Sequence, residues 1–143
     1  MSYFAHDDHR IFYEESGSSS AEPLLLLHGN TVSGRFFAPA VPKLSEKYHV
    51  ITMDFLGSGR SDRIAEWPAE LWYAWARQAE ALIHHLGYTA VHVIGCSGGA
   101  LTAINLALEC PNLVKTVTAD SFEGLHANAA ITEQIRIGRS MAK

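Results

Sequence analysis

The sequence is poor in the residues that mark several protein classes. Its two cysteines, Cys96 and Cys110, are too few for a disulfide framework and have no metal-binding spacing. We interpret them as small buried hydrophobic residues and expect neither a metal nor a cofactor. Lysine and arginine number 11 against 15 acidic residues, which gives a formal net charge of -4, and the basic residues form no cluster. This balance argues against nucleic acid as a partner.

Long apolar segments are missing as well. No run approaches the length that is needed to cross a bilayer. The first ten residues, MSYFAHDDHR, lack the basic region and apolar stretch of a secretory signal. We therefore expect a soluble cytoplasmic protein without membrane contacts. With 143 residues, 48% of them hydrophobic and 18% charged, the chain has the size and composition of one globular domain.

Short apolar runs alternate with segments of helical pattern along the chain. The residues from Tyr3 to Gly17 predict a hairpin that turns at Asp7 and Asp8. Four later runs are typical of parallel strands covered on both faces, and they lie at residues 24–28, 49–55, 90–96 and 113–120. Helices are predicted at about residues 34–47, 69–86 and 98–109, and from about residue 131 onward. This order predicts an α/β domain with a mostly parallel sheet of about six strands, flanked by helices.

A serine stands at one of the strand-to-helix junctions. In GCSGG, residues 95–99, Ser97 follows an apolar strand and precedes a helix, which is the context that the motif G-x-S-x-G requires. Such a bend pushes the hydroxyl clear of the sheet, and the N-terminus of the following helix favours developing negative charge. Ser97 is therefore a candidate nucleophile. The alternative is that it only caps the helix after a glycine turn.

Two further motifs occur in the same chain. LLLLHGN ends with His28, Gly29 and Asn30, and DFLGSGRSD occupies residues 54–62. Together with the serine bend, this set resembles the α/β-hydrolase superfamily, whose members carry H-G-x after the third strand, D-x-x-G-x-G-x-S after the fourth and the nucleophile after the fifth. The resemblance extends from about residue 3 to residue 121.

The resemblance implies acyl chemistry of the esterase or lipase kind on a small-molecule ester or acyl substrate. Ser97 would attack a carbonyl, and the backbone N–H groups of Asn30 and Gly98 would form the oxyanion hole. His28 would be structural, and the loop that begins at Asp54 would be a structural turn with a fixed hydrogen-bond network. The Asn30 side chain either serves the site or belongs to a turn residue with an unusual backbone angle. Five aromatic residues could line an acyl pocket or belong to the core: Phe36, Phe37, Trp67, Trp72 and Trp75.

The catalytic base is harder to assign. The family's usual sheet has eight strands and its histidine follows the last one, whereas this sequence predicts six. We therefore expect one domain over residues 1–143 that stops after the sixth strand, with residues 122–143 as the start of a helical lid region. Among the eight histidines, His126 follows the strand that ends at Asp120, so that Ser97, Asp120 and His126 keep the family's order of nucleophile, acid and base. Alternatively, Asp120 only ends a strand and His126 lies in a loop.

Two functional hypotheses follow. The first is a serine hydrolase by ancestry, which depends on a separate segment for its base. The second is a non-catalytic, truncated binding or interaction module. Because the sixth strand would be an exposed apolar edge, we also expect self-association or a second chain that completes the sheet.

Overall fold

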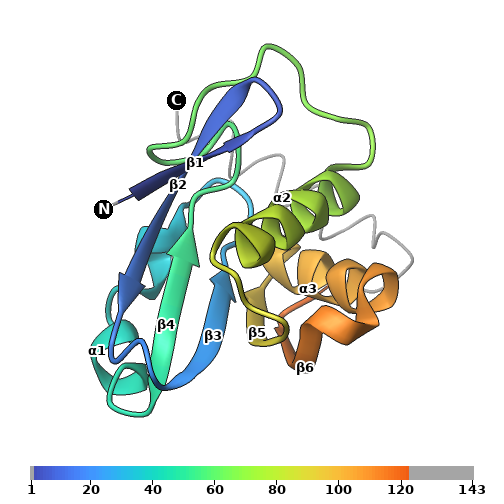
Figure 1. Ribbon diagram of the computed structural model, residues 1–143. Helices are drawn as coiled ribbons and strands as arrows, with labels where there is room; N and C mark the ends of the chain where they lie inside the picture. Colours follow the sequence, from blue (N-terminus) through green and yellow to red (C-terminus); the bar gives the residue numbers. More distant parts are fainter. Residues whose placement is uncertain (1, 123–143) are drawn as a thin grey trace.

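The computed structural model describes residues 2–122, so the predictions for His126 and for a helix from about residue 131 lie outside the described residues. Six strands form one sheet in the order β1-β2-β4-β3-β5-β6 (Figure 1). They are β1 (Ser2–His6), β2 (His9–Ser16), β3 (Glu22–Leu27), β4 (Tyr48–Met53), β5 (Val91–Cys96) and β6 (Val114–Asp120). The β1–β2 and β2–β4 pairs are antiparallel, whereas β4, β3, β5 and β6 are parallel to one another. The predicted fold class, a mostly parallel six-stranded α/β sheet, is confirmed.

Two long helices match their predictions and one does not. The helices α2 (Leu71–His85) and α3 (Gly98–Glu109) lie close to the predicted ranges. The single helix predicted at residues 34–47 is wrong: η1 (Gly34–Phe37) and α1 (Val41–Leu44) are separate short turns. Pro39 and Pro42 explain the difference, because neither has a backbone N–H to continue a helical ladder. A further short turn, η2 (Pro111–Leu113), leads into β6.

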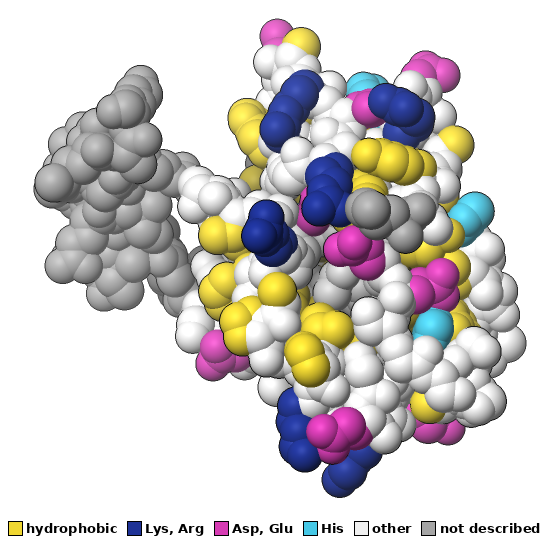
Figure 2. Space-filling view, turned by 90° about the vertical axis from the view of Figure 1, so that its left-hand side faces the viewer, with side chains coloured by type: hydrophobic (Ala, Val, Ile, Leu, Met, Phe, Trp, Pro, Cys, Tyr) yellow, Lys and Arg dark blue, Asp and Glu magenta, His cyan; other side chains and the backbone are white. Residues whose placement is uncertain are grey.

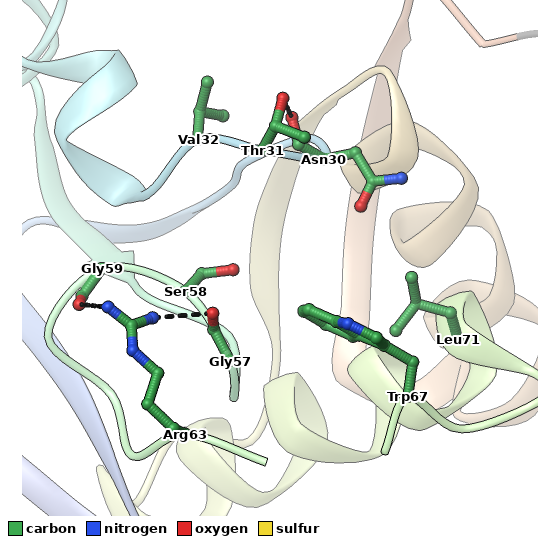
Figure 3. A pocket seen from close by; sticks show the side chains of 9 residues that line it. All are labelled: Asn30, Thr31, Val32, Gly57, Ser58, Gly59, Arg63, Trp67 and Leu71. Atoms are coloured by element: carbon green, nitrogen blue, oxygen red, sulfur yellow. Dashed lines mark hydrogen bonds between the residues drawn. The ribbon is translucent and has the colours of Figure 1, made fainter. Parts of the chain in front are cut away.

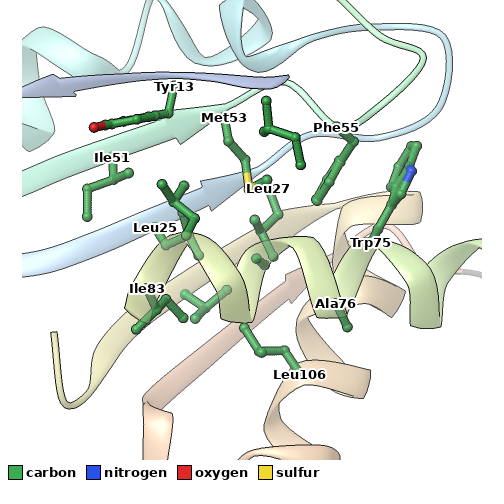
Figure 4. Close-up of a cluster of buried hydrophobic side chains, with 14 of the residues drawn as sticks. Tyr13, Leu25, Leu27, Ile51, Met53, Phe55, Trp75, Ala76, Ile83 and Leu106 are labelled. Carbon is green, nitrogen blue, oxygen red and sulfur yellow. The ribbon is translucent and has the colours of Figure 1, made fainter. Parts of the chain in front are cut away.

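The core lies on both faces of β3. Leu25 and Leu27 point into a large cluster with residues of α2 and α3, whereas Leu24 and Leu26 point into a smaller cluster with Phe37 of η1. In the large cluster, shown in Figure 4, the rings of Phe55 and Trp75 stack with their centroids 4.2 Å apart. Burial on both faces explains why the sequence of β3 is continuously apolar rather than alternating.

The surface and the helices show two further features. No helix among residues 2–122 is long and apolar enough to cross a membrane. On the face shown in Figure 2, basic and acidic side chains are interspersed and do not separate into patches of one sign. The parallel strands bring the carboxyl ends of β3, β4, β5 and β6 to the same edge of the sheet. In open α/β sheets, ligands bind at this edge.

Candidate active site

Ser97 occupies a strained turn between β5 and α3. Its backbone angles are φ 56° and ψ −120°, a region that non-glycine residues rarely adopt, and its side chain is exposed. Glycines on both sides make the turn possible. A Cβ atom on Gly95 would lie 2.1 Å from the Gly99 carbonyl oxygen, and one on Gly99 would lie 2.0 Å from that of Leu27. The Ser97 N–H donates to the Asp120 carbonyl oxygen at 2.9 Å, which ties the turn to β6.

Backbone from two other segments borders the Ser97 side chain. A Cβ atom on Gly29 would lie 3.0 Å from the Ser97 Cβ and 3.4 Å from its Oγ, so the loop after β3 passes directly beside the hydroxyl. Gly98 is the first residue of α3, and the first N–H groups of a helix have no intrahelical acceptor. On its other side Gly98 is covered by Trp72, whose ring would lie 2.3 Å from an added Cβ. Ser97 thus sits between one loop backbone and one helix N-terminus.

His28 has the structural position that the sequence predicts. It is fully buried, its Nδ1–H donates to the Gly29 carbonyl oxygen at 2.7 Å, and its Nε2 accepts the Phe55 N–H at 3.1 Å. Burial lowers the pKa of the imidazole, and the bond to Gly29 and the charge of Asp54 oppose this effect. With both ring nitrogens occupied, His28 holds the loops after β3 and β4 together and has no nitrogen left to act as a base.

The loop after β4 is the predicted hydrogen-bonded turn. The buried carboxylate of Asp54 accepts the N–H groups of Gly34 at 2.7 Å and Arg60 at 2.8 Å. The Ser61 hydroxyl donates to the Asp54 carbonyl oxygen and accepts the Phe12 N–H at 2.9 Å. These bonds engage both Asp54 and Ser61 in holding the shape of the loop.

The unusual backbone angle in the loop after β3 belongs to Thr31 and not to Asn30, for which the sequence analysis considered it. Thr31 has φ 64°, whereas Asn30 is not among the described residues with positive φ. The Thr31 hydroxyl donates to the Asn30 carbonyl oxygen at 2.6 Å. Left-handed backbone is costly for a β-branched residue such as threonine, and such strain collects at functional sites. The interpretation of Asn30 as the residue with the unusual angle is therefore wrong, and its side chain is directed into a pocket.

This pocket, with a volume of about 440 Å³, lies between the loops after β3 and β4 and the start of α2 (Figure 3). Its lining residues are Asn30, Thr31, Val32, Gly57, Ser58, Gly59, Arg63, Trp67 and Leu71. Of the aromatic residues considered for it, Trp67 lines the pocket, whereas Phe37 and Trp75 belong to the core. Ser58 and Arg63 were not among the candidate residues, because nothing in their local sequence indicates where their side chains point.

The structure separates the candidate acid from any described histidine. The Asp120 carboxylate is hydrogen-bonded to the Cys96 thiol, whose pKa is raised chiefly by burial and further by the charge of Asp120 and by this bond. His49 and His92 lie at the amino ends of β4 and β5, and His84 and His85 lie at the end of α2. The remaining two, His6 and His9, belong to the β1–β2 hairpin. Within residues 2–122, therefore, no histidine is hydrogen-bonded to the Ser97 hydroxyl.

Comparison with known proteins agrees with this geometry. The family model described as alpha/beta hydrolase fold matches residues 22–140. The magnesium-chelatase 30 kDa subunit of Rhodobacter capsulatus is 38% identical over 114 residues, which are 78% of this chain and 40% of that protein. The (E)-2-((N-methylformamido)methylene)succinate hydrolase of Acinetobacter baylyi is 34% identical over 105 residues, which are 72% of this chain and 38% of that protein. The chain thus spans about two fifths of the length of these curated relatives.

Solved structures show the same similarity. Naproxen esterase from Bacillus subtilis superposes with a TM-score of 0.83 at 25% identity, over 95% of this chain and 48% of that one. A hydrolase from Pseudomonas aeruginosa superposes with a TM-score of 0.85 over 99% of this chain and 53% of that one. At 19% identity, the latter similarity concerns the fold alone. The sheet order, the Ser97 turn and the family match together show that this chain belongs to the α/β-hydrolase fold family.

Proposed function

We propose that Ser97 is the nucleophile of a serine hydrolase that cleaves a carboxylic ester or a related acyl bond. The observation that carries this proposal is the backbone of Ser97, which holds an exposed hydroxyl at φ 56° and ψ −120° on the N-terminus of α3. Strain of this kind persists only where the surrounding structure enforces it. A serine that only capped the helix would need no such conformation, and its side chain makes no capping hydrogen bond here.

In the proposed reaction the Ser97 oxygen attacks the substrate carbonyl carbon and gives its proton to a base. The base then protonates the departing alcohol, water attacks the acyl-serine, and the carboxylic acid leaves as the Ser97 hydroxyl is restored. The oxygen that becomes negative would accept the backbone N–H groups of Gly98 and Asn30. Supporting this role, Gly98 begins α3, and Asn30 follows the glycine that borders the Ser97 side chain.

The proposed base is a histidine supplied from outside residues 2–122. Within this chain that histidine is His126, with Asp120 as the acid that orients it. Asp120 lies at the correct edge of the sheet, since its carbonyl oxygen already accepts the Ser97 N–H. For the catalytic role its carboxylate would have to exchange the Cys96 thiol for the imidazole.

A fluorophosphonate probe tests the nucleophile, because it phosphonylates only an activated serine. The intact mass of the 15.7 kDa chain is recorded after labelling, for the wild type, Ser97→Ala and Ser121→Ala. Ser121 is a matched control, since it is also exposed and has a positive φ of 59° at the end of a neighbouring strand.

One adduct on the wild type and on Ser121→Ala, but none on Ser97→Ala, would support the proposal. An unlabelled wild type, or an adduct that persists in Ser97→Ala, would overturn it. An unlabelled chain would instead favour a non-catalytic binding module.

A further inference from the structure

We propose that the pocket beside Ser97 binds a carboxylate group, with Arg63 as the cation that recognises it. This inference rests on the proposed function and extends it: the substrate would be an acyl compound that also carries a carboxylate. Its basis is the pocket's charge, its free hydrogen-bond donors and its apolar wall.

Arg63 is the only ionisable side chain among the nine residues that line the pocket. Its guanidinium donates to the carbonyl oxygens of Gly57 at 2.7 Å and Gly59 at 3.2 Å (Figure 3). Among residues 2–122 it has no carboxylate partner, whereas Arg10 and Arg77 each pair with one. A guanidinium carries five N–H donors, so further donors remain for a ligand. The two carbonyls fix the position of a positive charge that no acidic side chain of residues 2–122 neutralises.

Two neutral side chains with hydrogen-bond donors border the same space. In Figure 3 the Ser58 hydroxyl points from the side of Arg63 toward Trp67, and the Asn30 amide lies over the side formed by Trp67 and Leu71. Ser58 is only 9% exposed, yet no hydrogen bond engages its hydroxyl within the described residues. The Asn30 side chain is likewise unbonded there, although its carbonyl oxygen accepts a bond from Thr31. A carboxylate has two oxygens that accept from such donors, and its charge complements the guanidinium.

The opposite wall suits the carbon skeleton of an organic acid. Trp67 is 56% exposed, and Leu71 lies beside it on the side of the pocket away from Arg63 (Figure 3). The Trp67 ring is packed against Gly57, where a Cβ atom would lie 2.6 Å from the ring, so the indole has a defined place. Apolar walls with a few fixed polar groups are typical of small-molecule sites, and about 440 Å³ lies within their usual range. One cation and this apolar wall favour an organic carboxylate over inorganic phosphate.

The pocket and the Ser97 turn share two connections. Asn30 lines the pocket and directly follows Gly29, whose backbone borders the Ser97 hydroxyl. Leu71 lines the pocket and directly precedes Trp72, which covers Gly98. A ligand with its carboxylate at Arg63 would therefore extend along Asn30 and bring its other end toward Ser97.

Binding can be measured without turnover on Ser97→Ala. Monomethyl succinate and dimethyl succinate share a skeleton and an ester but differ in the carboxylate. Each is titrated by heteronuclear NMR, with the amide signals of residues 57–63 and the Trp67 indole N–H as reporters. We expect monomethyl succinate to bind about tenfold or more tightly than the dimethyl ester, since a charge-assisted pair is lost in the latter. Equal affinities would overturn the proposal, and this comparison needs no variant of Arg63.

Two variants in the same background locate the charge. Arg63→Gln should weaken monomethyl succinate binding about tenfold and leave the dimethyl ester unaffected. The control Arg35→Gln removes the same charge from an exposed residue of η1 outside the pocket and should not change the affinity. Unchanged binding in Arg63→Gln, or inorganic phosphate binding as tightly as monomethyl succinate, would contradict a carboxylate site. The binding measurements use Ser97→Ala, so their result does not depend on whether Ser97 of the wild type reacts with the fluorophosphonate. A failure of the carboxylate site and a failure of the proposed nucleophile can therefore be told apart.

Discussion

A chain with glycine at position 97 should be more stable than one with alanine there, although glycine is the less stable of the two at most positions. A non-glycine residue held in a sparsely populated backbone region costs about 1–3 kcal/mol, and Ser97 is such a residue at φ 56°. Glycine relieves this strain but adds about 0.4–1 kcal/mol of unfolded-state entropy relative to alanine. The Ser97 side chain is exposed and makes no hydrogen bond within residues 2–122, so its removal costs little packing. The net expectation is a gain of about 1 kcal/mol for Ser97→Gly over Ser97→Ala.

Urea unfolding followed by far-UV circular dichroism measures this difference, with Ser97→Ala as the reference because it keeps the Cβ atom and the strain. Both variants retain the N–H that donates to Asp120. A gain of about 1 kcal/mol corresponds to a rise of about 3 °C in the melting temperature. A Ser97→Gly variant that is less stable than Ser97→Ala, as at an ordinary position, would refute the claim of strain.

Four further expectations concern the loop network, pH, the base and the sheet edge. Asp54→Ala leaves the buried N–H group of Gly34 and the partly buried one of Arg60 without their acceptor, and should cost about 2–4 kcal/mol in the unfolding free energy, measured by urea titration. A loss below 1 kcal/mol would contradict the network. Burial lowers the folded-state pKa of His28, so the unfolded chain binds more protons and stability should fall as the pH drops below about 6.5. This decline should be smaller in His28→Asn, and an equal decline would point to other groups. His126→Ala should abolish fluorophosphonate labelling if His126 is the base, whereas undiminished labelling would assign the base elsewhere. We propose that the chain self-associates through β6, which pairs on one side only among the described strands; light scattering should show a lower mass for Thr118→Pro, and a wild-type monomer would contradict this.

Much of the fold could be predicted because its signals are local. The four consecutive leucines of β3 indicate burial on both faces, and the structure places them in two clusters. Asp7 and Asp8 mark the hairpin turn, with Asp7 at φ 50°. The helix predicted at residues 34–47 is wrong because Pro39 and Pro42 interrupt the backbone hydrogen-bond ladder, and two short turns form instead.

The site was predictable only where a motif fixes the backbone. The glycines around Ser97 indicate the tight turn, and the resemblance to the α/β-hydrolase superfamily implies a structural role for His28, with which its buried, hydrogen-bonded ring agrees. The strain at Thr31 is not predictable from the sequence, because β-branched residues disfavour positive φ and asparagine tolerates it better. Arg63 lines the pocket because the irregular loop after β4 places it there. The sequence has no periodic pattern in this loop from which its course could be predicted.

Peptide mapping of the labelled chain tests the central claim most directly, because it identifies the atom that reacts. The wild-type chain is treated with the fluorophosphonate, digested, and sequenced by tandem mass spectrometry. The account predicts a single modified residue, Ser97, with the other serines, Ser58 in the pocket included, unmodified. Modification of Ser58 or of another serine instead of Ser97 would contradict it.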